Sequence, residues 1–273
     1  MARILVRGSG DIGSAIALRL RSRGHAVVLH DEPRPAHARR GMAFVDALFE
    51  GSCTLEGMLA HRATGVESLA RMLAGGGALP VSDAPFAEVL AAVTPDVLVD
   101  ARMHKHDEPE AIRGLAPIAI GLGPGFVAGG NADVVIETAW GESLGRVVRA
   151  GGASDYSGEP RPLGGHGRER YVYAAVAGSF ATGRAIGDRV AEGEVVAHVD
   201  RSAVVAPLAG ILRGLTHDGA PVAVGTKILE VDARGDPSGA FGVGERPGRI
   251  AAGVLEAVSM RLGYDFGDED PGQ

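Results

Sequence analysis

The chain contains 273 residues, of which 45% are apolar and 22% are charged, and this balance is typical of a soluble globular protein with one large core or two domains. Its formal net charge of −7 argues against a nucleic-acid-binding protein, because such a protein would carry a basic domain. The sequence shows no run of about 18 apolar residues and no signal-peptide pattern, so we expect neither a membrane-spanning helix nor secretion. Cys53 is the only cysteine, which excludes an internal disulfide and favours a cytoplasmic location.

The first predicted unit is a strand, a glycine loop, a helix and a second strand. Residues 4–6 form a short apolar strand, apolar residues recur with helical spacing from 12 to 20, and residues 25–30 form the next strand before Asp31. Glycines let a phosphate approach the backbone, the helix N-terminus offers free N–H groups, and an acid at the position of Asp31 can bind a ribose hydroxyl. The alternative is that the glycines serve only the packing of the helix on the strand. The loop reads G-x-G-x-x-G, and its candidate ligand contacts are Gly8, Gly10, Asp11 and Gly13.

An arginine pair, Arg39 and Arg40, follows the second strand and precedes a helical run. Guanidinium groups bind phosphates through paired donors, so the pair is a candidate phosphate clamp, whereas the alternative is a solvated helix end. Two later strands end in Asp100-x-Arg102 and in a second glycine loop, which can also be read as a sharp turn. Because ligands bind beyond the carboxyl ends of strands in an open sheet, we expect these loops and the first glycine loop to line one crevice. The candidate residues of the second glycine loop are Gly121, Gly123 and Gly125.

Other reactive side chains are weaker candidates. His104 and His106 could ligate zinc only with a second pair of ligands at a recognised spacing, and none is present, so we expect a solvated loop and no metal site. Nothing beside Cys53 would clearly depress its pKa, so this cysteine is expected to act as a small buried hydrophobe. The sequence has no nucleophile-elbow motif and no Walker-type motif, so no catalytic residue is assigned.

A Gly- and Pro-rich stretch over 156–167 precedes an internal repeat whose two copies are offset by 32 residues. Each copy resembles the half-motif of biotinyl and lipoyl domains, in which two copies interlock as a barrel-sandwich hybrid. The apex between the copies, residues 200–205, contains no lysine, so a docking or capping element is expected rather than a swinging-arm carrier. An amphipathic helix is predicted over 246–263, and residues 266–273 are predicted to form a disordered acidic tail. The identical pairs of the repeat are Gly187 and Gly219, Val190 and Val222, Ala191 and Ala223, Gly193 and Gly225, Val199 and Val231, and Asp200 and Asp232.

The order of these blocks resembles that of a known family. The matching blocks are the first glycine loop, Arg39-Arg40, Phe49-Glu50-Gly51, Val99-Asp100-Ala101-Arg102, Gly121-Leu122-Gly123-Pro124-Gly125-Phe126, Val135-Ile136-Glu137-Thr138, Gly187-Asp188 and Gly253-Val254-Leu255-Glu256-Ala257. On these blocks, over roughly residues 2–262, the chain resembles the selenium-dependent molybdenum hydroxylase maturation proteins of the YqeB type, which are distantly akin to the xanthine dehydrogenase accessory proteins. That family usually begins with three consecutive glycines, whereas Ser9 interrupts the run here.

The patterns and the resemblance together predict an α/β fold with three parts. These are a Rossmann-like nucleotide- or cofactor-binding domain over 1–155, a small all-β barrel-sandwich-hybrid (biotinyl/lipoyl-like) domain over 168–236, and a C-terminal helix over 246–263. The resemblance implies a factor that binds a molybdopterin-type cofactor and assists its modification with sulfur or selenium, or its insertion. The implied partners are a molybdenum hydroxylase apoenzyme or other cofactor-biosynthesis proteins.

Two other classes of function remain open. An NAD(P)-dependent oxidoreductase is favoured by the first glycine loop and Asp31, and a docking scaffold for a hydroxylase is favoured by the repeat. The residues leave open whether the chain catalyses a reaction and whether it forms a homo-oligomer.

Overall fold

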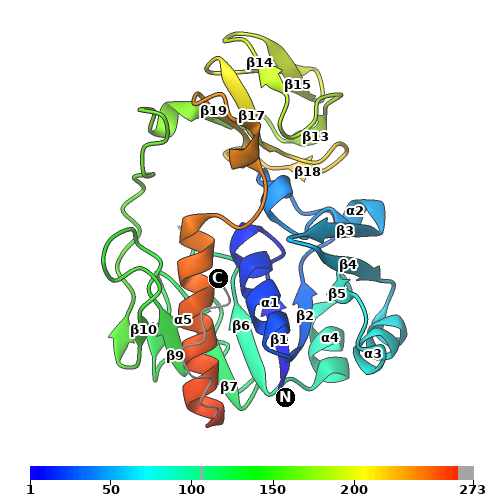
Figure 1. Ribbon diagram of the computed structural model, residues 1–273, viewed down its shortest axis with the longest axis vertical. Helices are drawn as coiled ribbons and strands as arrows, with labels where there is room; N and C mark the ends of the chain where they lie inside the picture. The colour runs from blue at the N-terminus through cyan, green and yellow to red at the C-terminus, as the bar shows by residue number, and fades with distance from the viewer. Residues whose placement is uncertain (105–106, 264–273) are drawn as a thin grey trace.

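The computed structural model describes residues 1–104 and 107–263 (Figure 1). Within these residues the core is a nine-stranded mixed sheet. Its strands are β1 (Arg3–Arg7), β2 (Ala26–His30), β3 (Ser52–Leu55), β4 (Met58–Ala63), β5 (Leu79–Ser82), β6 (Val97–Asp100), β7 (Ile118–Leu122), β9 (Val134–Ile136) and β10 (Val147–Val148). The order across the sheet is β10-β9-β7-β6-β1-β2-β5-β4-β3. Neighbours from β9 to β4 run parallel, whereas β10 and β3 run antiparallel to their neighbours.

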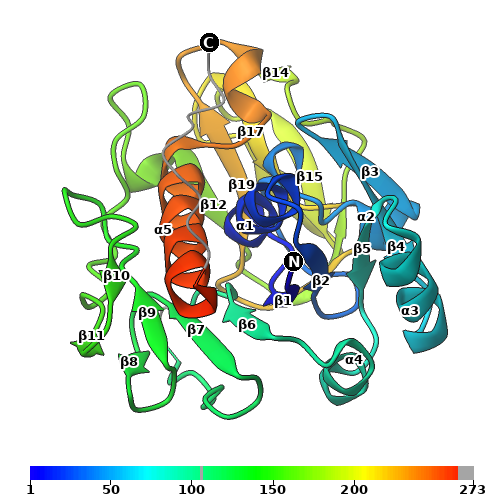
Figure 2. The ribbon, with the colours of Figure 1, turned by 60° about the horizontal axis from the view of Figure 1, so that its bottom comes forward.

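Helices cover both faces of this sheet, as Figure 2 shows. The α-helices are α1 (Asp11–Ser22), α2 (Ala47–Glu50), α3 (Val66–Gly75), α4 (Phe86–Val93) and α5 (Glu245–Leu262), and the 3-10 helices are η1 (Arg40–Met42), η2 (Arg168–Arg170) and η3 (Pro237–Ala240). On β1, the buried Ile4 and Val6 belong to the core that α1 and α5 complete, whereas Leu5 belongs to the core beneath α3 and α4. Because successive side chains of a strand face opposite sides, a strand buried on both faces reads as a continuous apolar run.

The C-terminal helix returns to the large sheet and lies beside α1 (Figures 1 and 2). Gly253 allows α5 to pack closely on the connection between β9 and β10, because a Cβ there would overlap the carbonyl oxygen of Gly145. The predicted helix over 246–263 is confirmed as α5. The predicted strand–helix–strand unit at the start is confirmed as β1, α1 and β2, with β1 and β2 parallel.

The internal repeat folds into two antiparallel sheets of four strands each within the described part of the chain. The first copy contributes β12 (Tyr171–Tyr173), β13 (Gly178–Ala181), β14 (Arg189–Val190) and β15 (Val195–Val199), and the second contributes β16 (Ser202–Val205), β17 (Gly210–Leu215), β18 (Pro221–Val222) and β19 (Lys227–Asp232). The strand orders are β12-β19-β17-β14 and β16-β15-β13-β18. Each copy therefore lends its first and third strands to the sheet that the other copy builds on its second and fourth strands.

The predicted fold class, a Rossmann-like domain followed by a barrel-sandwich hybrid, is wrong. The large sheet is mixed, the described residues between β6, β7 and β9 contain no helix, and β8 (Val127–Ala128) and β11 (Gly151–Gly152) form a separate antiparallel sheet. The repeat forms two further antiparallel sheets instead of the biotinyl-like domain that its glycine spacing suggested. The physical reason is that the first glycine loop specifies one crossover only, and the later turn-rich connections are set by tertiary packing.

The lengths of the helices and the C-terminal residues bear on two expectations from the sequence. Within the described ranges, none of the helices has the length and apolar character needed to cross a membrane. The predicted acidic tail over 266–273 lies outside the described residues.

Candidate anion-binding crevice

The N-terminal ends of α1 and α5 meet at the boundary between the large sheet and the repeat. Both helices begin at this boundary and run away from it side by side (Figures 1 and 2). Their N-cap residues, Gly10 and Gly244, have no side chain that could cap the first turn. The backbone N–H groups of Asp11 and Glu245 make no hydrogen bond to any described residue. The boundary therefore receives the partial positive charge of two helix ends.

Arg39 joins the two halves of the molecule at this boundary. Its Nη1 donates to Asp11 Oδ2 at 3.0 Å, and its Nε donates to Glu230 Oε2 at 2.7 Å. The Glu230 side chain is fully buried. Burial alone would raise the pKa of Glu230, but the charges of Arg39 and Lys227 outweigh burial and hold this pKa well below its ordinary value. Glu230 is consequently ionised at neutral pH.

Further cations from the repeat surround Glu230. Arg213 Nη1 lies 2.9 Å and Arg170 Nε lies 3.3 Å from Glu230 Oε1. Lys227 Nζ lies 3.8 Å from Glu230 Oε2 and 4.7 Å from the ring centre of Tyr171. One buried carboxylate thus faces several positive charges.

Arg246, in the first turn of α5, reaches the same space. Its Nε donates to the carbonyl oxygen of Thr138 at 2.9 Å. Burial lowers the pKa of Arg246, the negative charge of Asp11 raises it, and the positive charge of Arg39 lowers it again. These groups therefore act on one another across one crevice. Among the described residues, its cations Arg39, Arg170, Arg213, Lys227 and Arg246 outnumber its carboxylates Asp11 and Glu230.

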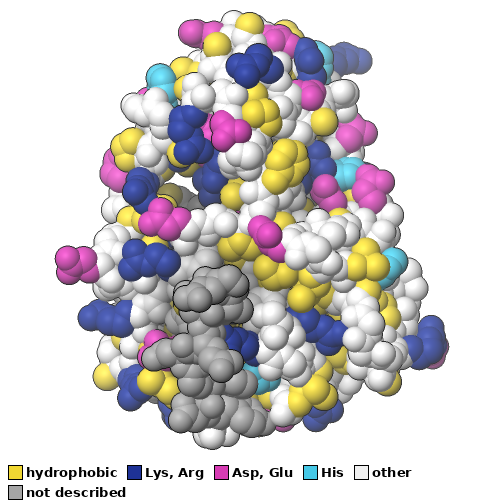
Figure 3. All heavy atoms as spheres, in the orientation of Figure 1, with side chains coloured by type: hydrophobic (Ala, Val, Ile, Leu, Met, Phe, Trp, Pro, Cys, Tyr) yellow, Lys and Arg dark blue, Asp and Glu magenta, His cyan; other side chains and the backbone are white. Residues whose placement is uncertain are grey.

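The crevice is open to solvent. The side chains of Asp11, Arg39 and Lys227 keep 23%, 22% and 29% of their exposure. In the space-filling view the surface is hollowed at the boundary between the two halves, and Lys and Arg side chains stand near the opening (Figure 3). The exposed parts of Arg39 and Lys227 are therefore accessible to an anionic group.

The first glycine loop is packed against its own chain. Gly8 has a φ of +105°, and a Cβ there would lie 3.1 Å from the backbone of Ala101. A Cβ on Gly13 would overlap the carbonyl oxygen of Gly8, and a Cβ on Gly10 would lie 3.1 Å from the imidazole of His37. The packing interpretation of the sequence therefore accounts for Gly8 and Gly13, and Gly10 faces a side chain of the protein.

The carboxylate of Asp31 also forms its hydrogen bonds with groups of the same chain. Its Oδ2 accepts from the Ser9 N–H at 2.6 Å, from the Ser9 hydroxyl at 2.7 Å and from His37 Nε2 at 3.0 Å. Burial alone would raise the pKa of Asp31, but His37 and Ser9 hold it well below its ordinary value. Burial would lower the pKa of His37, and Asp31 raises it above its ordinary value. Oδ2 of Asp31 is therefore engaged by the protein itself.

The other predicted arginines have carboxylate or carbonyl partners as well. Arg40 donates to the Leu215 carbonyl oxygen and to Asp46 Oδ2, both at 2.8 Å. Arg102 donates from Nε and Nη2 to Asp100 Oδ2 at 3.1 and 2.6 Å, and Asp100 is fully buried. Arg40 thus ties the repeat to the large sheet, and Arg102 neutralises the carboxylate that ends β6.

The Asp100–Arg102 geometry recurs in the second copy of the repeat. Arg234 contacts Asp232 Oδ2 through Nε at 3.1 Å and through Nη2 at 2.6 Å, and its N–H donates to Oδ1 at 3.0 Å. The recurrence at the end of another strand identifies Asp-x-Arg as a local turn that buries a paired carboxylate.

The second glycine loop packs tightly after β7. A Cβ on Gly121 would overlap the Phe126 ring, and a Cβ on Gly123 would press on Thr138. Gly125 faces Pro109 in the same way. Of the predicted site residues, Asp11 and Arg39 line the crevice, Gly8 lies against Arg102, and the second loop packs against its neighbours.

The remaining candidates contribute no assembled site. Burial raises the pKa of the Cys53 thiol to about 11, and its Sγ donates to the Phe44 carbonyl oxygen at 3.3 Å. His104 Nε2 lies 3.5 Å from Asp100 Oδ2, whereas His106 lies outside the described residues. Over 1–104 and 107–263, no group of three or more His, Cys, Asp or Glu side chains is placed to hold a metal ion.

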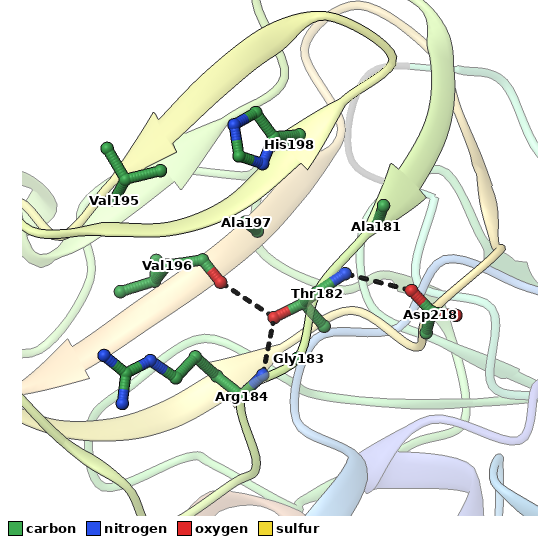
Figure 4. A pocket seen from close by; sticks show the side chains of 9 residues that line it. All are labelled: Ala181, Thr182, Gly183, Arg184, Val195, Val196, Ala197, His198 and Asp218. Atoms are coloured by element: carbon green, nitrogen blue, oxygen red, sulfur yellow. Dashed lines mark hydrogen bonds between the residues drawn. The ribbon is translucent and has the colours of Figure 1, made fainter.

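A pocket of about 630 Å³ lies mainly on the first copy of the repeat and is also lined by Asp218 of the second copy; His198 and Arg184 flank Thr182 there (Figure 4). The Thr182 hydroxyl donates to the Val196 carbonyl oxygen at 2.8 Å, and its N–H donates to Asp218 Oδ1 at 2.9 Å. These contacts stabilise the turn after β13. The pocket contains none of the residues that the sequence predicted for a site.

Sequence reasoning missed Lys227, Glu230, Arg213, Arg246 and Tyr171. A signal was available in the repeat itself. The two copies are offset by 32 residues, and at this offset Arg213, Lys227 and Glu230 replace Ala181, Val195 and His198. When strand positions are charged in one copy of a repeat and uncharged or only weakly polar in the other, the two copies are expected to pack against different parts of the protein.

The fold and the crevice define a two-part protein with a cationic cleft at its internal boundary, and comparison with known proteins adds a relationship. No family model matches the chain. The chain is 37% identical over 259 residues to a protein of Escherichia coli strain K12 described as "Uncharacterized protein YqeB". The match covers 95% of this chain and 48% of YqeB, so the chain spans about half the length of that relative. The resemblance to YqeB-type proteins is thereby confirmed as a sequence relationship.

Solved structures give only weak similarity. The ectoine utilization protein EutE (DoeB) from Ruegeria pomeroyi, in its apo structure, is 14% identical with a TM-score of 0.22, covering 60% of this chain and 63% of that chain. A succinylglutamate desuccinylase/aspartoacylase from Rhodobacter sphaeroides is 16% identical with a TM-score of 0.21, covering 54% and 61%. Similarity at this level carries no argument about the activity of this chain.

Proposed function

We propose that this chain is a maturation factor for a molybdenum hydroxylase and that its crevice binds the phosphate end of a molybdopterin-type cofactor. The observation that carries the proposal is the surplus of positive charge at the crevice. Arg39, Lys227 and Arg246 gather there at the N-terminal ends of α1 and α5. A phosphate or pyrophosphate gains charge-assisted hydrogen bonds from such side chains and favourable electrostatics from helix N-termini.

The donors present fit the chemistry of this group. Molybdopterin carries an anionic phosphate, and its nucleotide form carries a pyrophosphate. Arg246 supports such binding best. Among the hydrogen bonds of the described residues, its guanidinium forms one, from Nε to the Thr138 carbonyl oxygen. Arg39 is already shared between Asp11 and Glu230, so its contribution is mainly to the electrostatic potential. We therefore assign the direct contact to Arg246 and the supporting field to the other cations.

The chemistry of Cys53 favours binding and insertion over covalent transfer by this chain. A thiol with a pKa of about 11 is almost entirely protonated at neutral pH, whereas the thiolate is the nucleophile in sulfur chemistry. In this proposal the sulfur or selenium atom comes from a partner protein, and the selenium dependence belongs to the hydroxylase system that the chain serves. The proposed partners are the hydroxylase apoenzyme and other proteins of cofactor biosynthesis.

Equilibrium dialysis of the full chain against molybdopterin, measured by the fluorescence of the oxidised pterin, tests the proposal. Arg246→Gln removes the charge and shortens the side chain but keeps a polar amide, and it is expected to weaken binding by about 10- to 100-fold because a hydrogen bond to a charged group contributes about 1.5–3 kcal/mol. Arg261→Gln, at the exposed opposite end of α5, is the matched control and should bind like the unmodified chain.

Two outcomes of the dialysis experiment would contradict the proposal. Absence of binding to both molybdopterin and its nucleotide form at 0.1 mM, on the order of the upper range of cofactor affinities, would remove the proposal. Equal loss in Arg246→Gln and Arg261→Gln would show a general charge effect and would remove the crevice as the site. A further measurement mixes the loaded chain with apo-hydroxylase, and we expect activity to appear faster than with free cofactor.

A further inference from the structure

A second pair of arginines converges at the carboxyl ends of the central strands β1 and β6. Arg7 is the last residue of β1, and Arg102 follows β6 by two residues. Arg7 Nη1 lies 3.1 Å and Arg102 Nη2 lies 3.3 Å from the same oxygen, Glu110 Oε2. In open sheets of mainly parallel strands, ligands bind beyond the carboxyl ends of the strands, which is where these two donors meet.

Arg7 is a rigid and incompletely satisfied donor. Its side chain is 8% exposed, and its guanidinium carbon lies 3.7 Å from the ring centre of Phe86. Its Nε is buried and has no hydrogen-bond partner among the described residues. Stacking on Phe86 fixes the guanidinium plane, so the donor is preorganised for an acceptor that a ligand brings.

The partner of these arginines is a surface side chain. Glu110 is 70% exposed, although both arginines hold its carboxylate. A hydrogen bond from Arg7 and the charges of both arginines lower the pKa of Glu110 below its ordinary value, so it is ionised at neutral pH. A carboxylate on an exposed side chain can leave such a contact at little cost in packing.

The local charge selects a singly charged anion. Asp100 is fully buried, and its Oδ2 lies 3.9 Å from Arg7 Nη1 and 2.6 Å from Arg102 Nη2. Among the described residues that form ion pairs here, the two guanidinium charges, less the charge of Asp100, leave one positive charge that Glu110 balances. A monoanionic carboxylate restores this balance, whereas a phosphate dianion exceeds it.

We propose that Arg7 and Arg102 form a binding site for the carboxylate of a small-molecule ligand, and that Glu110 fills this site until the ligand displaces it. The site lies beyond the proposed function, because it uses neither Arg246 nor Lys227 and requires no phosphate. Its occupant in the ligand-free chain is the protein's own carboxylate, which acts as a competitor.

Removing the competitor is the direct experiment. Glu110→Gln keeps the size of the side chain and removes its charge, and Glu108→Gln makes the same change at an exposed residue that forms no ion pair with either arginine among the described residues. Propionate, a singly charged carboxylate, and inorganic phosphate are titrated into each full-length protein, and the Nε–H resonance of Arg7 is followed by NMR. If Glu110 fills the site for about nine-tenths of the time, its removal raises the apparent propionate affinity about tenfold.

The expected result is this gain in Glu110→Gln alone, with a shift of the Arg7 Nε–H resonance and a smaller gain for phosphate. Propionate affinity in Glu110→Gln within twofold of the unmodified chain would overturn the proposal. An equal gain in Glu108→Gln would overturn it too, since the effect would then be one of net charge. A phosphate gain as large as the propionate gain would overturn the assignment to carboxylates.

Discussion

Replacing Glu230 with glutamine removes the negative charge that holds the cations of the internal boundary together. The side chain is fully buried, with Arg39 at 2.7 Å, Arg213 at 2.9 Å and Arg170 at 3.3 Å. Glutamine can accept a hydrogen bond, but it leaves the guanidinium charges without their counter-ion. Breaking a buried ion pair by removing one partner costs about 3–5 kcal/mol. We expect the free energy of unfolding to fall by about this amount and the melting temperature to fall by about 10 °C.

Urea unfolding at pH 7, followed by circular dichroism, measures this loss. His198→Gln is the matched control, because His198 occupies the position of Glu230 in the first copy of the repeat and is exposed. The dependence of the unfolding free energy on pH at acidic pH gives a second measurement. The pKa of Glu230 is lowered on folding, so its contribution is present above its unfolded pKa of about 4.3 and is lost as the pH falls through the lower folded pKa. A loss below about 1 kcal/mol, the size of a surface pair, would refute the argument that Glu230 holds the boundary.

Three further outcomes follow from the glycine loop and its surroundings. The pKa of His37 is raised on folding, so its contribution is complete below its unfolded pKa of about 6.5 and is lost as the pH rises through the folded pKa. The stability advantage of the unmodified chain over His37→Gln should therefore shrink over this range, as thermal unfolding of both proteins at several pH values will show, because the lowered pKa values of His25 and His30 affect both proteins alike. Gly13→Ala should destabilise the fold by several kcal/mol, because its Cβ would overlap the carbonyl oxygen of Gly8. The control, Gly75→Ala, lies in open space at the end of α3 and should be neutral or stabilise by up to about 1 kcal/mol. Equal urea midpoints for the two variants would contradict this expectation. Millimolar NAD(H) or NADP(H) should leave the melting temperature unchanged because Asp31 is engaged by His37, and stabilisation of about 2.7 kcal/mol, expected at a hundredfold excess over Kd, would reverse this conclusion.

Local structure was predictable wherever a periodic pattern and a turn signal coincided. The strand, helix and strand around Gly8 to Asp31 formed as expected, as did the helix over 246–263. The repeat was visible from its glycines, and its strands recur at the same offset. The fold class was not predictable in this way, because the neighbours of a strand in a sheet depend on how the strands are connected. No sequence pattern before β7 predicts that the connection from β6 to β7 lacks a helix.

The candidate site shows the same limit more sharply. The sequence identified Asp11 and Arg39 but could not reveal that Arg39 meets Glu230, which lies 191 positions along the chain. Arg102 looked available for a phosphate because its partner, Asp100, is two residues away and its orientation depends on burial at the end of β6. Charged residues can be listed from a sequence, but which of them neutralise each other is decided by long-range packing.

The exchange of strands between the two copies of the repeat explains why the cations gather on one side. Equivalent positions occupy equivalent places in the two four-stranded sheets, so identical sequences in the two copies would present identical faces. Among the ion pairs of the described residues, Arg39 meets the second copy, where Glu230 is a buried carboxylate with arginines around it. One carboxylate and one bridging arginine would suffice to join the two halves. Arg213, Lys227 and Arg246 exceed what the joint requires, and this excess supports a role for the crevice in holding an anion.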